Sequence, residues 1–134
     1  MKKIILFFVS FCLILPVFGR ELPKIDEFLI ILGRVESSNN PKAYNKSENA
    51  IGIYQIRLLY FKDAQQFDKN LIKYSHSDCF SPEISKKVVI AYLSKYCKKN
   101  DFESWARCHN SGPNWKNKKH LTNKYWKKFL EKSK

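Results

Sequence analysis

The sequence is poor in glycine, with only four among its 134 residues. This scarcity disfavours folds that need many tight turns, such as a small β-barrel, because glycine supplies the turn conformations. It also disfavours a glycine-rich phosphate-binding loop. No segment alternates apolar and polar residues with a period of two, and no internal repeat is visible. A half-buried β-sheet is therefore not expected to dominate the fold.

Acidic residues are also few, with 12 Asp and Glu against 25 Lys and Arg, so the formal net charge is +13. The length suits one domain. Hydrophobic residues make up 44% and aromatic residues 15%, which is enough for a packed core and argues against intrinsic disorder. The charge indicates either a solvated lysine coat or a polyanionic partner: nucleic acid, anionic lipid or cell wall. Charge alone leaves these alternatives open.

The longest apolar run covers residues 4–18 and is too short to cross a membrane, since a spanning helix needs roughly 20 residues. A positively charged start precedes the run, Pro16 breaks its end, and Val17 and Gly19 are small enough for signal peptidase. We therefore predict a signal peptide over residues 1–19, the alternative being a membrane anchor. The mature protein would be secreted or periplasmic, without stable membrane insertion after cleavage.

Removal of the signal peptide would leave a single domain over residues 20–134 with a net charge of +11, since two lysines leave with it. Export argues against a nucleic-acid partner. The remaining cysteines are Cys79, Cys97 and Cys108, without a CxxC pair and with only three histidines in the chain, so no metal site and no cofactor are expected. An odd number leaves the pairing open, with a slight preference for Cys97 with Cys108, which would join two neighbouring helices.

Start and stop signals predict an almost entirely helical domain. The first helix would begin with Pro23 at its first position and stop at residues 37–41, and the second would run from about Arg57 to Phe67. Three more helices are expected after N-cap residues: Ser81, Asp101 and Thr122. Side chains expected to face inward from the last helix are Tyr125, Trp126, Phe129 and Leu130.

Glu36 continues the apolar stripe of the first helix, four residues after Leu32 and in the last turn before the helix stop. Its side chain should therefore point at the core. Burial and the negative end of the helix dipole both raise the pKa of a carboxyl group, which gives a proton donor usable near neutral pH. The alternative is a glutamate that reaches solvent or pairs with Arg34 or Arg57.

Four short motifs follow one another along the chain. They are Glu36-Ser37, Asn40-Pro41-Lys42-Ala43, Ala50-Ile51-Gly52-Ile53-Tyr54-Gln55-Ile56 and His109-Asn110-Ser111-Gly112-Pro113. In order and spacing they resemble the motifs of the lytic transglycosylase (SLT-type) and lysozyme-like superfamily, and the resemblance runs from about Glu27 to Lys128. It implies an all-α lysozyme-like fold, or an α fold with a minimal β element.

The resemblance also implies that Glu36 is the catalytic acid and base of a lytic transglycosylase, which cleaves the MurNAc–GlcNAc bond of peptidoglycan and leaves 1,6-anhydro ends. Animal-type lysozymes carry an aspartate two residues before the motif glycine, where this chain has Ala50. This departure puts a two-carboxylate mechanism in doubt. One alternative is a hydrolysing muramidase that uses Glu36 with a second carboxylate such as Glu48. The other is a non-catalytic cationic protein that binds the cell envelope.

The same motifs suggest which residues would bind the glycan. Gly52 would let the backbone approach a sugar, Gln55 would bond near Glu36 or to an acetamido group, and Tyr125 would place a hydroxyl near the cleavage point. The full set of predicted substrate-binding residues is Ser37, Gly52, Tyr54, Gln55, Asn110, Gly112 and Tyr125. For both tyrosines the alternative is core packing, as it is for Trp115 and Trp126, and His109 is interpreted as a packed residue. The expected partner is the peptidoglycan strand, bound by a monomer.

Overall fold

The computed structural model describes residues 24–134 as five α-helices with short 3₁₀ helices and a very small sheet between them. The α-helices are α1 (Ile25–Ser37), α2 (Leu58–Phe67), α3 (Pro82–Tyr96), α4 (Phe102–Ser111) and α5 (Asn123–Lys132). The 3₁₀ helices are η1 (Lys69–Leu71), η2 (His76–Phe80) and η3 (Trp115–Thr122). The predicted fold class, all α with a minimal β element, is confirmed. The predicted signal peptide and Pro23 lie outside the described residues.

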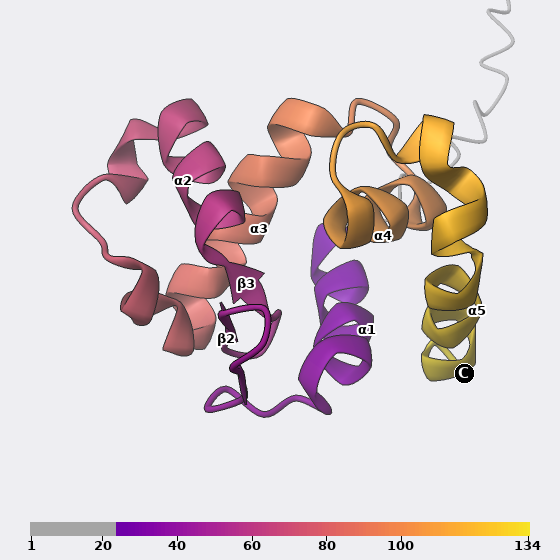
Figure 1. The fold of residues 1–134 in the computed structure, drawn as a ribbon, viewed down its shortest axis with the longest axis horizontal. Helices are drawn as coiled ribbons and strands as arrows, with labels where there is room; N and C mark the ends of the chain where they lie inside the picture. The colour runs from indigo at the N-terminus through magenta and orange to yellow at the C-terminus, as the bar shows by residue number, and fades with distance from the viewer. Residues whose placement is uncertain (1–23) are drawn as a thin grey trace, which may run out of the picture.

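The sheet has three antiparallel strands of two residues each, in the order β1 (Tyr44–Asn45), β2 (Ala50–Ile51) and β3 (Ile56–Arg57). Its register pairs Tyr44 with Ile51 and Ile51 with Ile56. In Figure 1 the strands lie on one side of α1 together with α2 and α3, and α4 and α5 lie on the other. Helix α1 therefore runs through the middle of the molecule, between two groups of elements.

Helix α1 ends where the sequence predicts. Ser38 and Asn39 both adopt left-handed backbone conformations, with φ of 54° and 62°. The N–H of Asn39 donates to the backbone oxygen of Gly33 at 3.0 Å, which satisfies a carbonyl at the helix end. The chain then turns away toward β1. This stop places Glu36 in the last turn of the helix.

The three predicted N-cap residues occupy the expected positions, but only one caps with its side chain. The Asp101 carboxylate accepts from the Ser104 N–H at 2.7 Å, as an N-cap should. Ser81 precedes α3 without a capping bond. The Thr122 hydroxyl donates to the backbone oxygen of Lys119 and accepts from Arg107 at 2.7 Å. Sequence therefore located these helix starts better than it predicted their hydrogen bonds.

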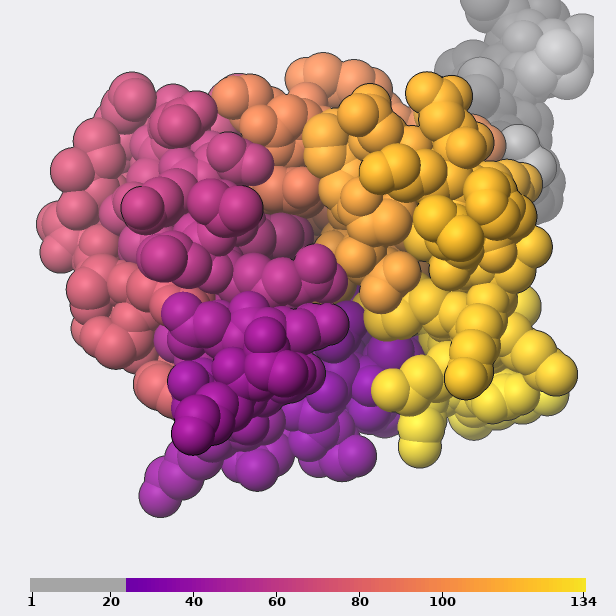
Figure 2. Space-filling model, in the orientation of Figure 1, coloured from indigo at the N-terminus to yellow at the C-terminus, as the bar shows by residue number. Residues whose placement is uncertain are grey.

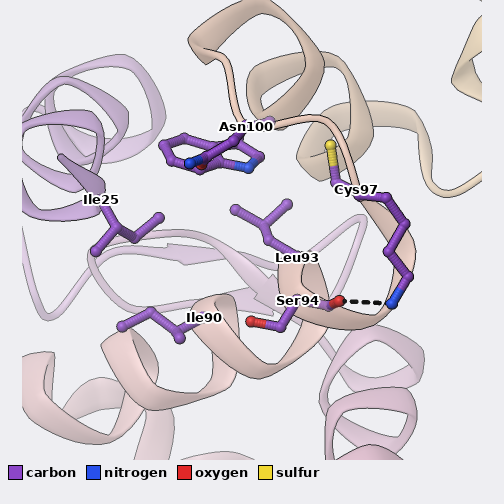
Figure 3. Close-up of a pocket in the computed structure, with 8 residues that line it drawn as sticks. Ile25, Ile90, Leu93, Ser94, Cys97 and Asn100 are labelled. Carbon is purple, nitrogen blue, oxygen red and sulfur yellow. Dashed lines mark hydrogen bonds between the residues drawn. The ribbon is translucent and has the colours of Figure 1, made fainter. Parts of the chain in front are cut away.

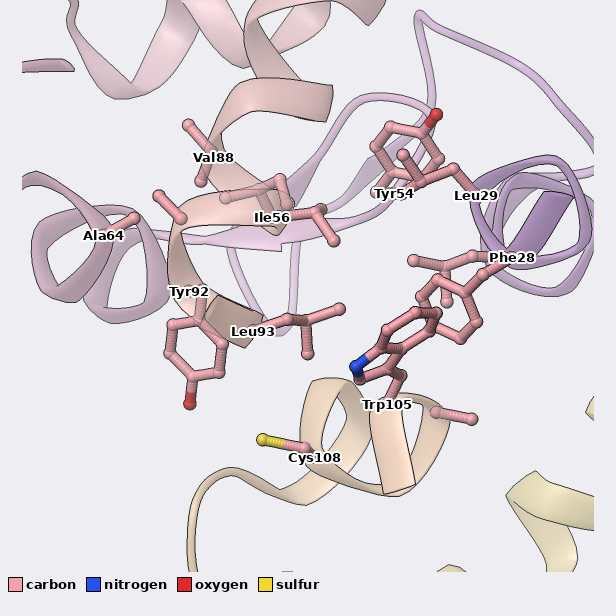
Figure 4. Packing of buried hydrophobic residues seen from close by; sticks show 14 of the residues in the cluster. Phe28, Leu29, Tyr54, Ile56, Ala64, Val88, Tyr92, Leu93, Trp105 and Cys108 are labelled. Carbon is pink, nitrogen blue, oxygen red and sulfur yellow. The ribbon is translucent and has the colours of Figure 1, made fainter. Parts of the chain in front are cut away.

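The core fixes α1 against the second group of helices (Figure 4). Phe28 is fully buried, with its ring centroid 5.3 Å from that of Trp105 and 5.4 Å from that of Phe129. Truncation of such a buried aromatic side chain costs about 3–5 kcal/mol. The prediction that Leu130 faces inward was wrong, since it is 45% exposed. Burial of Phe28 and Phe129 instead determines which face of α5 packs on α1.

Cys79, Cys97 and Cys108 are buried as free thiols, and those of Cys97 and Cys108 are hydrogen-bonded to each other, so the favoured disulfide between these neighbours stays a prediction. Among residues 24–134, no helix combines the length and the apolar character that crossing a membrane requires.

Candidate active site around Glu36

Glu36 points inward at the end of α1, as predicted, and its side chain is only 17% exposed. The Tyr125 hydroxyl donates a hydrogen bond to its carboxylate, and the Nε2 atom of His109 lies 3.6 Å from the same oxygen. Burial raises the pKa of Glu36, while the Tyr125 bond and the charges of Lys128 and Arg57 lower it, and the net shift is upward. Glu36 therefore has the character of a proton donor.

The alternative that Glu36 is neutralised by an arginine is not observed. Arg34 points toward the end of α5, where its guanidinium donates to the backbone oxygen of Lys132 at 3.4 Å. Arg57 lies 3.6 Å from a carboxylate oxygen of Glu48 and donates to the backbone oxygen of Asn110 at 3.2 Å. Neither arginine therefore forms an ion pair with Glu36, and the charge of Arg57 only partly offsets the effect of burial on its pKa.

His109 is buried beside Glu36 as a neutral ring with a defined tautomer. Its Nε2 atom faces the backbone oxygen of Tyr54 at 3.1 Å, and a carbonyl can only accept, so Nε2 carries the proton. Its Nδ1 atom then accepts from the Tyr60 hydroxyl at 3.0 Å. Burial lowers the pKa of His109 to about 4, so the ring is uncharged at neutral pH. Helical spacing predicted its burial, but not its contact with Glu36.

Two predicted site residues, Ser37 and Gln55, form hydrogen bonds with the backbone of the segment that contains the small sheet. The Ser37 hydroxyl donates to the backbone oxygen of Ile53 at 2.8 Å and accepts from the N–H of Asn40 at 3.1 Å. Gln55 adopts a left-handed backbone, and its side-chain amide donates to the backbone oxygens of Gly52 and Ala43 at 2.9 and 3.3 Å. Both side chains bond to backbone atoms, and neither contacts the Glu36 carboxylate by a hydrogen bond. Their glycan contacts stay a prediction.

Position 52 requires glycine because the backbone of another segment lies close to it, a contact that the sequence did not predict. The φ of Gly52 is +76°, and a Cβ atom there would lie 2.2 Å from the backbone oxygen of Cys79 in η2. The close approach that this glycine permits is thus to the protein's own backbone, and an approach to sugar stays untested. Tyr54 is only 7% exposed and lies in the core in Figure 4, close to Leu29. Its side chain packs in the core, as the alternative interpretation held.

Two cavities flank Glu36 and share Asn110. The first, here called the sheet-side cavity, has a volume of about 340 Å³ and is lined among others by Glu48, Arg57, His109 and Gly112. The second, the α5 cavity, has about 600 Å³ and is lined by Asn110, Leu121, Lys124, Tyr125, Lys127, Lys128 and Glu131. Each cavity contains one contact of Glu36, His109 in the first and Tyr125 in the second. We refer to these two cavities, which share Asn110 and each contain one contact of Glu36, as the two halves of the cleft.

The surface agrees with this arrangement. In Figure 2 the α1 segment (indigo) lies recessed between the magenta segment that contains the sheet and the yellow C-terminal segment. A further cavity of about 490 Å³ lies near the carboxyl end of α3 (Figure 3). Ile25, Ile90, Leu93 and Cys97 line it, and its lining includes no carboxylate. Acid chemistry therefore belongs to the cleft around Glu36.

Besides Glu36, the carboxylates of the cleft are Glu48 and Asp63 in the sheet-side cavity and Glu131 in the α5 cavity, and of these Glu48 influences the pKa of Glu36. Glu48 lines the sheet-side cavity, pairs with Arg57 at 3.6 Å, and acts electrostatically on Glu36, whose pKa it raises. Both members of the ion pair are about half exposed, so the pair is solvent-screened and can exchange its partners. Within the described part of the chain, no three His, Cys, Asp or Glu residues cluster as metal ligands would.

The two tryptophans of uncertain role pack within the protein. Trp115 is 8% exposed and belongs to the core, and Trp126 stacks on Phe129 with centroids 5.5 Å apart. Trp126 remains partly exposed, so one face of its ring is available to solvent.

Comparison with known families gives one result. The family model described as Destabilase matches residues 26–132, which includes every element that builds the cleft. This is a lysozyme-like family, so the match confirms the predicted superfamily, while the transglycosylase branch of that superfamily stays a prediction. The chain has no significant match among curated proteins.

Proposed function

Because the chain belongs to the Destabilase family of lysozyme-like glycosidases, we propose that it cleaves the β-1,4 bond between N-acetylmuramic acid and N-acetylglucosamine in peptidoglycan, with Glu36 as general acid. The observation that carries this proposal is the position of Glu36. A largely buried carboxyl group with a raised pKa contacts Tyr125 of one cavity and lies 3.6 Å from His109 of the other. Such a group protonates the leaving oxygen of a glycosidic bond.

The neighbours of Glu36 support both protonation states of the reaction. Burial keeps the acid protonated before the step. Once its proton has moved to the glycosidic oxygen and the C–O bond has broken, the Tyr125 hydroxyl and the charge of Lys128 stabilise the carboxylate that remains. The pKa of Tyr125 is raised well above its ordinary value by burial, so its hydroxyl keeps the proton that it donates.

Glu48 favours hydrolysis as the completion of this reaction. It lies in the half of the cleft that contains His109, and its charge reaches Glu36. A carboxylate there can accept a proton from a water molecule that attacks the anomeric carbon, which leaves a reducing end. Membership in a lysozyme-like family supports the same outcome. A hydrolysing muramidase is therefore the proposed activity.

The transglycosylase route is the second candidate, and a specific observation favours it. Ala50, at the position of the animal lysozyme aspartate, is fully buried in β2, and Glu48 is bound to Arg57. With Glu48 so occupied, Glu36 would act first as acid and then as base. The muramyl 6-hydroxyl would then attack the anomeric carbon, lose its proton to Glu36, and form a 1,6-anhydro ring.

The first experiment tests Glu36 as the acid. Glu36→Gln should lower cleavage of purified peptidoglycan by at least a hundredfold, since general acid catalysis contributes roughly 10²- to 10⁴-fold. Glu27→Gln, on the exposed face of the same helix, is the matched control and should keep wild-type activity. Full cleavage activity in Glu36→Gln, with an unchanged circular dichroism spectrum, would overturn Glu36 as the acid, and absence of cleavage in the wild-type protein would leave non-catalytic binding to the envelope.

The second experiment distinguishes the two routes by mass spectrometry of the released muropeptides. Hydrolysis predicts reducing ends that decrease strongly in Glu48→Gln. The transglycosylase route predicts 1,6-anhydro ends that persist in that variant. Anhydro ends from the wild-type protein would overturn the proposed hydrolytic step and leave Glu36 as the acid in either case.

Export remains part of the proposal. Peptidoglycan lies outside the cytoplasm, and a signal peptide over residues 1–19 would deliver the protein there. Amino-terminal sequencing of the mature protein should begin at Arg20. Retention of the first 19 residues would argue against secretion and against the predicted domain boundary.

A further inference from the structure

The α5 cavity contains two lysines that have no acidic partner. Lys124 and Lys127 line the cavity and are exposed, and within residues 24–134 neither makes an ion pair or a side-chain hydrogen bond. Lys128 is held differently, because its ammonium group donates to the backbone oxygen of Val35 at 2.6 Å. Glu131 also lines this cavity, so its four charged side chains leave a net positive charge. The cavity therefore suits an anion.

Some lysines outside the cleft form ion pairs, whereas others, such as Lys62 and Lys69, do not among the residues that the structure describes. Lys86 pairs with Asp26 at 2.6 Å, and Lys87 pairs with Glu83 at 2.7 Å. The sheet-side cavity is also internally compensated, because Arg57 pairs with Glu48 there. Of the two halves of the cleft, the α5 half is lined by more basic than acidic side chains, whereas Arg57 in the sheet-side half stands beside Glu48 and Asp63.

The position of this charge relative to Glu36 limits what it can bind. Tyr125 lines the α5 cavity and also donates to the Glu36 carboxylate. Asn110 lines this cavity and the sheet-side cavity. A group that occupies the α5 cavity is therefore a substituent of the same glycan chain whose bond lies at Glu36.

We propose that the α5 cavity is a subsite for the carboxylate of the muramyl side arm, recognised by Lys124 and Lys127. This inference rests on the proposed function, because peptidoglycan is the glycan in question. Of its two sugars only the muramyl unit carries an acidic arm, either a free lactyl carboxylate or the carboxylates of an attached stem peptide. The protein would thus select peptidoglycan over neutral glycans of N-acetylglucosamine by charge beside the cleavage point.

The test measures binding in the Glu36→Gln background, so that no ligand is cleaved. Three soluble probes of equal length are used: peptide-free glycan with lactyl carboxylates, glycan with stem peptides, and neutral N-acetylglucosamine oligomers. The pair Lys124→Gln and Lys127→Gln should weaken binding of an anionic probe about tenfold at low salt, since each exposed charge pair contributes roughly 0.2–1 kcal/mol. Binding of the neutral oligomer should not change.

The matched control is the pair Lys62→Gln and Lys69→Gln, which removes the same charge from exposed positions on α2 and η1. It should leave all three affinities near the wild-type values. A loss on the peptide-free probe identifies the lactyl carboxylate as the ligand, and a loss confined to the peptide-bearing probe identifies the stem peptide. An equal loss on the neutral oligomer, an equal loss in the control pair, or no loss on either anionic probe would overturn the proposal.

Failure of the proposed function gives a different result. If the wild-type protein cleaves no peptidoglycan, the glycosidase assignment is wrong, and the binding comparison still reports on the cavity. If cleavage occurs and the lysine pair binds anionic and neutral probes like wild type, only the subsite is wrong. High salt supplies a further check, because screening should shrink the tenfold difference on the anionic probe.

Discussion

The two halves of the cleft are constructed by different means. The sheet-side half is fixed by backbone contacts: Gly52 lies against Cys79, Gln55 and Ser37 bond to main-chain oxygens, and His109 donates to Tyr54. The α5 half is the polar face of one helix, anchored by buried Phe129. The difference suggests that the first half determines the shape of the cleft and the second its charge. Substitutions in the two halves should therefore affect different measurements.

Gly52→Ala should have the largest effect, because it tests the backbone contact of the sheet-side half. The added methyl group would lie 2.2 Å from the backbone oxygen of Cys79, and the φ of +76° is unfavourable for alanine. We expect a loss of about 3 kcal/mol or more in the free energy of unfolding, from overpacking and backbone strain together. Chemical denaturation followed by circular dichroism measures it.

Gly112→Ala is the matched control for this prediction. Its φ is +86°, but the nearest atom to an added Cβ is the Tyr92 hydroxyl at 3.6 Å, an ordinary contact. Only the conformational strain should remain, at about 1 kcal/mol. Equal destabilisation by both substitutions would show that backbone strain, and not the contact with η2, makes Gly52 necessary.

Glu36 itself contacts one residue of each half, and its burial should reduce stability at neutral pH. Folding raises its pKa above the ordinary value of 4.5, so the native state binds the proton more tightly than the unfolded chain. The resulting stabilisation is complete below 4.5 and is lost as the pH rises through the raised pKa. Glu36→Gln should match wild type in acid and exceed it at neutral pH, on the order of 1 kcal/mol.

Thermal unfolding at a series of pH values measures this difference. A stability gain of Glu36→Gln that is the same at every pH would contradict titration of the carboxyl as its cause. Glu27→Gln, which removes a carboxyl group from an exposed position of the same helix, is the matched control.

Tyr125→Phe tests the α5 half, because this hydroxyl is its direct contact with Glu36. Loss of the bond removes an influence that lowers the pKa of Glu36, so the pKa should rise further. Since the acid must be protonated to act, the alkaline limb of the kcat/KM profile should move upward by about one pH unit, the value of a hydrogen bond to a charged group. Tyr44→Phe, at an exposed position on β1, should leave the profile unchanged.

A downward shift of the alkaline limb in Tyr125→Phe would show that Tyr125 chiefly stabilises the protonated acid. That result would also remove a difference between the two halves of the cleft, because neither half would then stabilise the ionised form of Glu36.

The sequence predicted the parts of this arrangement that depend on neighbouring residues. Glu36 follows Leu32 by one helical turn, so its inward direction could be read from spacing. The helix stop after it and the Asp101 cap are also local signals, and both are observed. The strands could not be predicted from periodicity, because each has only two residues.

Contacts between distant residues escaped prediction. Tyr125 lies 89 residues from Glu36, and motif resemblance alone placed its hydroxyl near the cleavage point. The neutral His109 beside Glu36 depends on the Tyr60 hydroxyl and on a carbonyl of the sheet, neither of which leaves a pattern in the sequence. Gly52 was selected for the absence of a Cβ atom, but its contact with the backbone of Cys79 left no pattern in the sequence, and its approach to a sugar stays a prediction.

Arg57→Gln should have the smallest effect and tests whether binding charge is confined to α5. Its pair with Glu48 is half exposed, so the free energy of unfolding should change by less than about 1 kcal/mol. Because Glu48 already compensates the charge of Arg57, Arg57→Gln should weaken binding of an anionic glycan by no more than about threefold. The pair Lys124→Gln and Lys127→Gln should weaken it about tenfold. Titration with the peptide-free probe measures the two affinities, and chemical denaturation measures the free energy of unfolding. An equal loss of affinity in Arg57→Gln and in the lysine pair would mean that Arg57 leaves Glu48 to bind the glycan. Both halves of the cleft would then bind the acidic groups of the glycan.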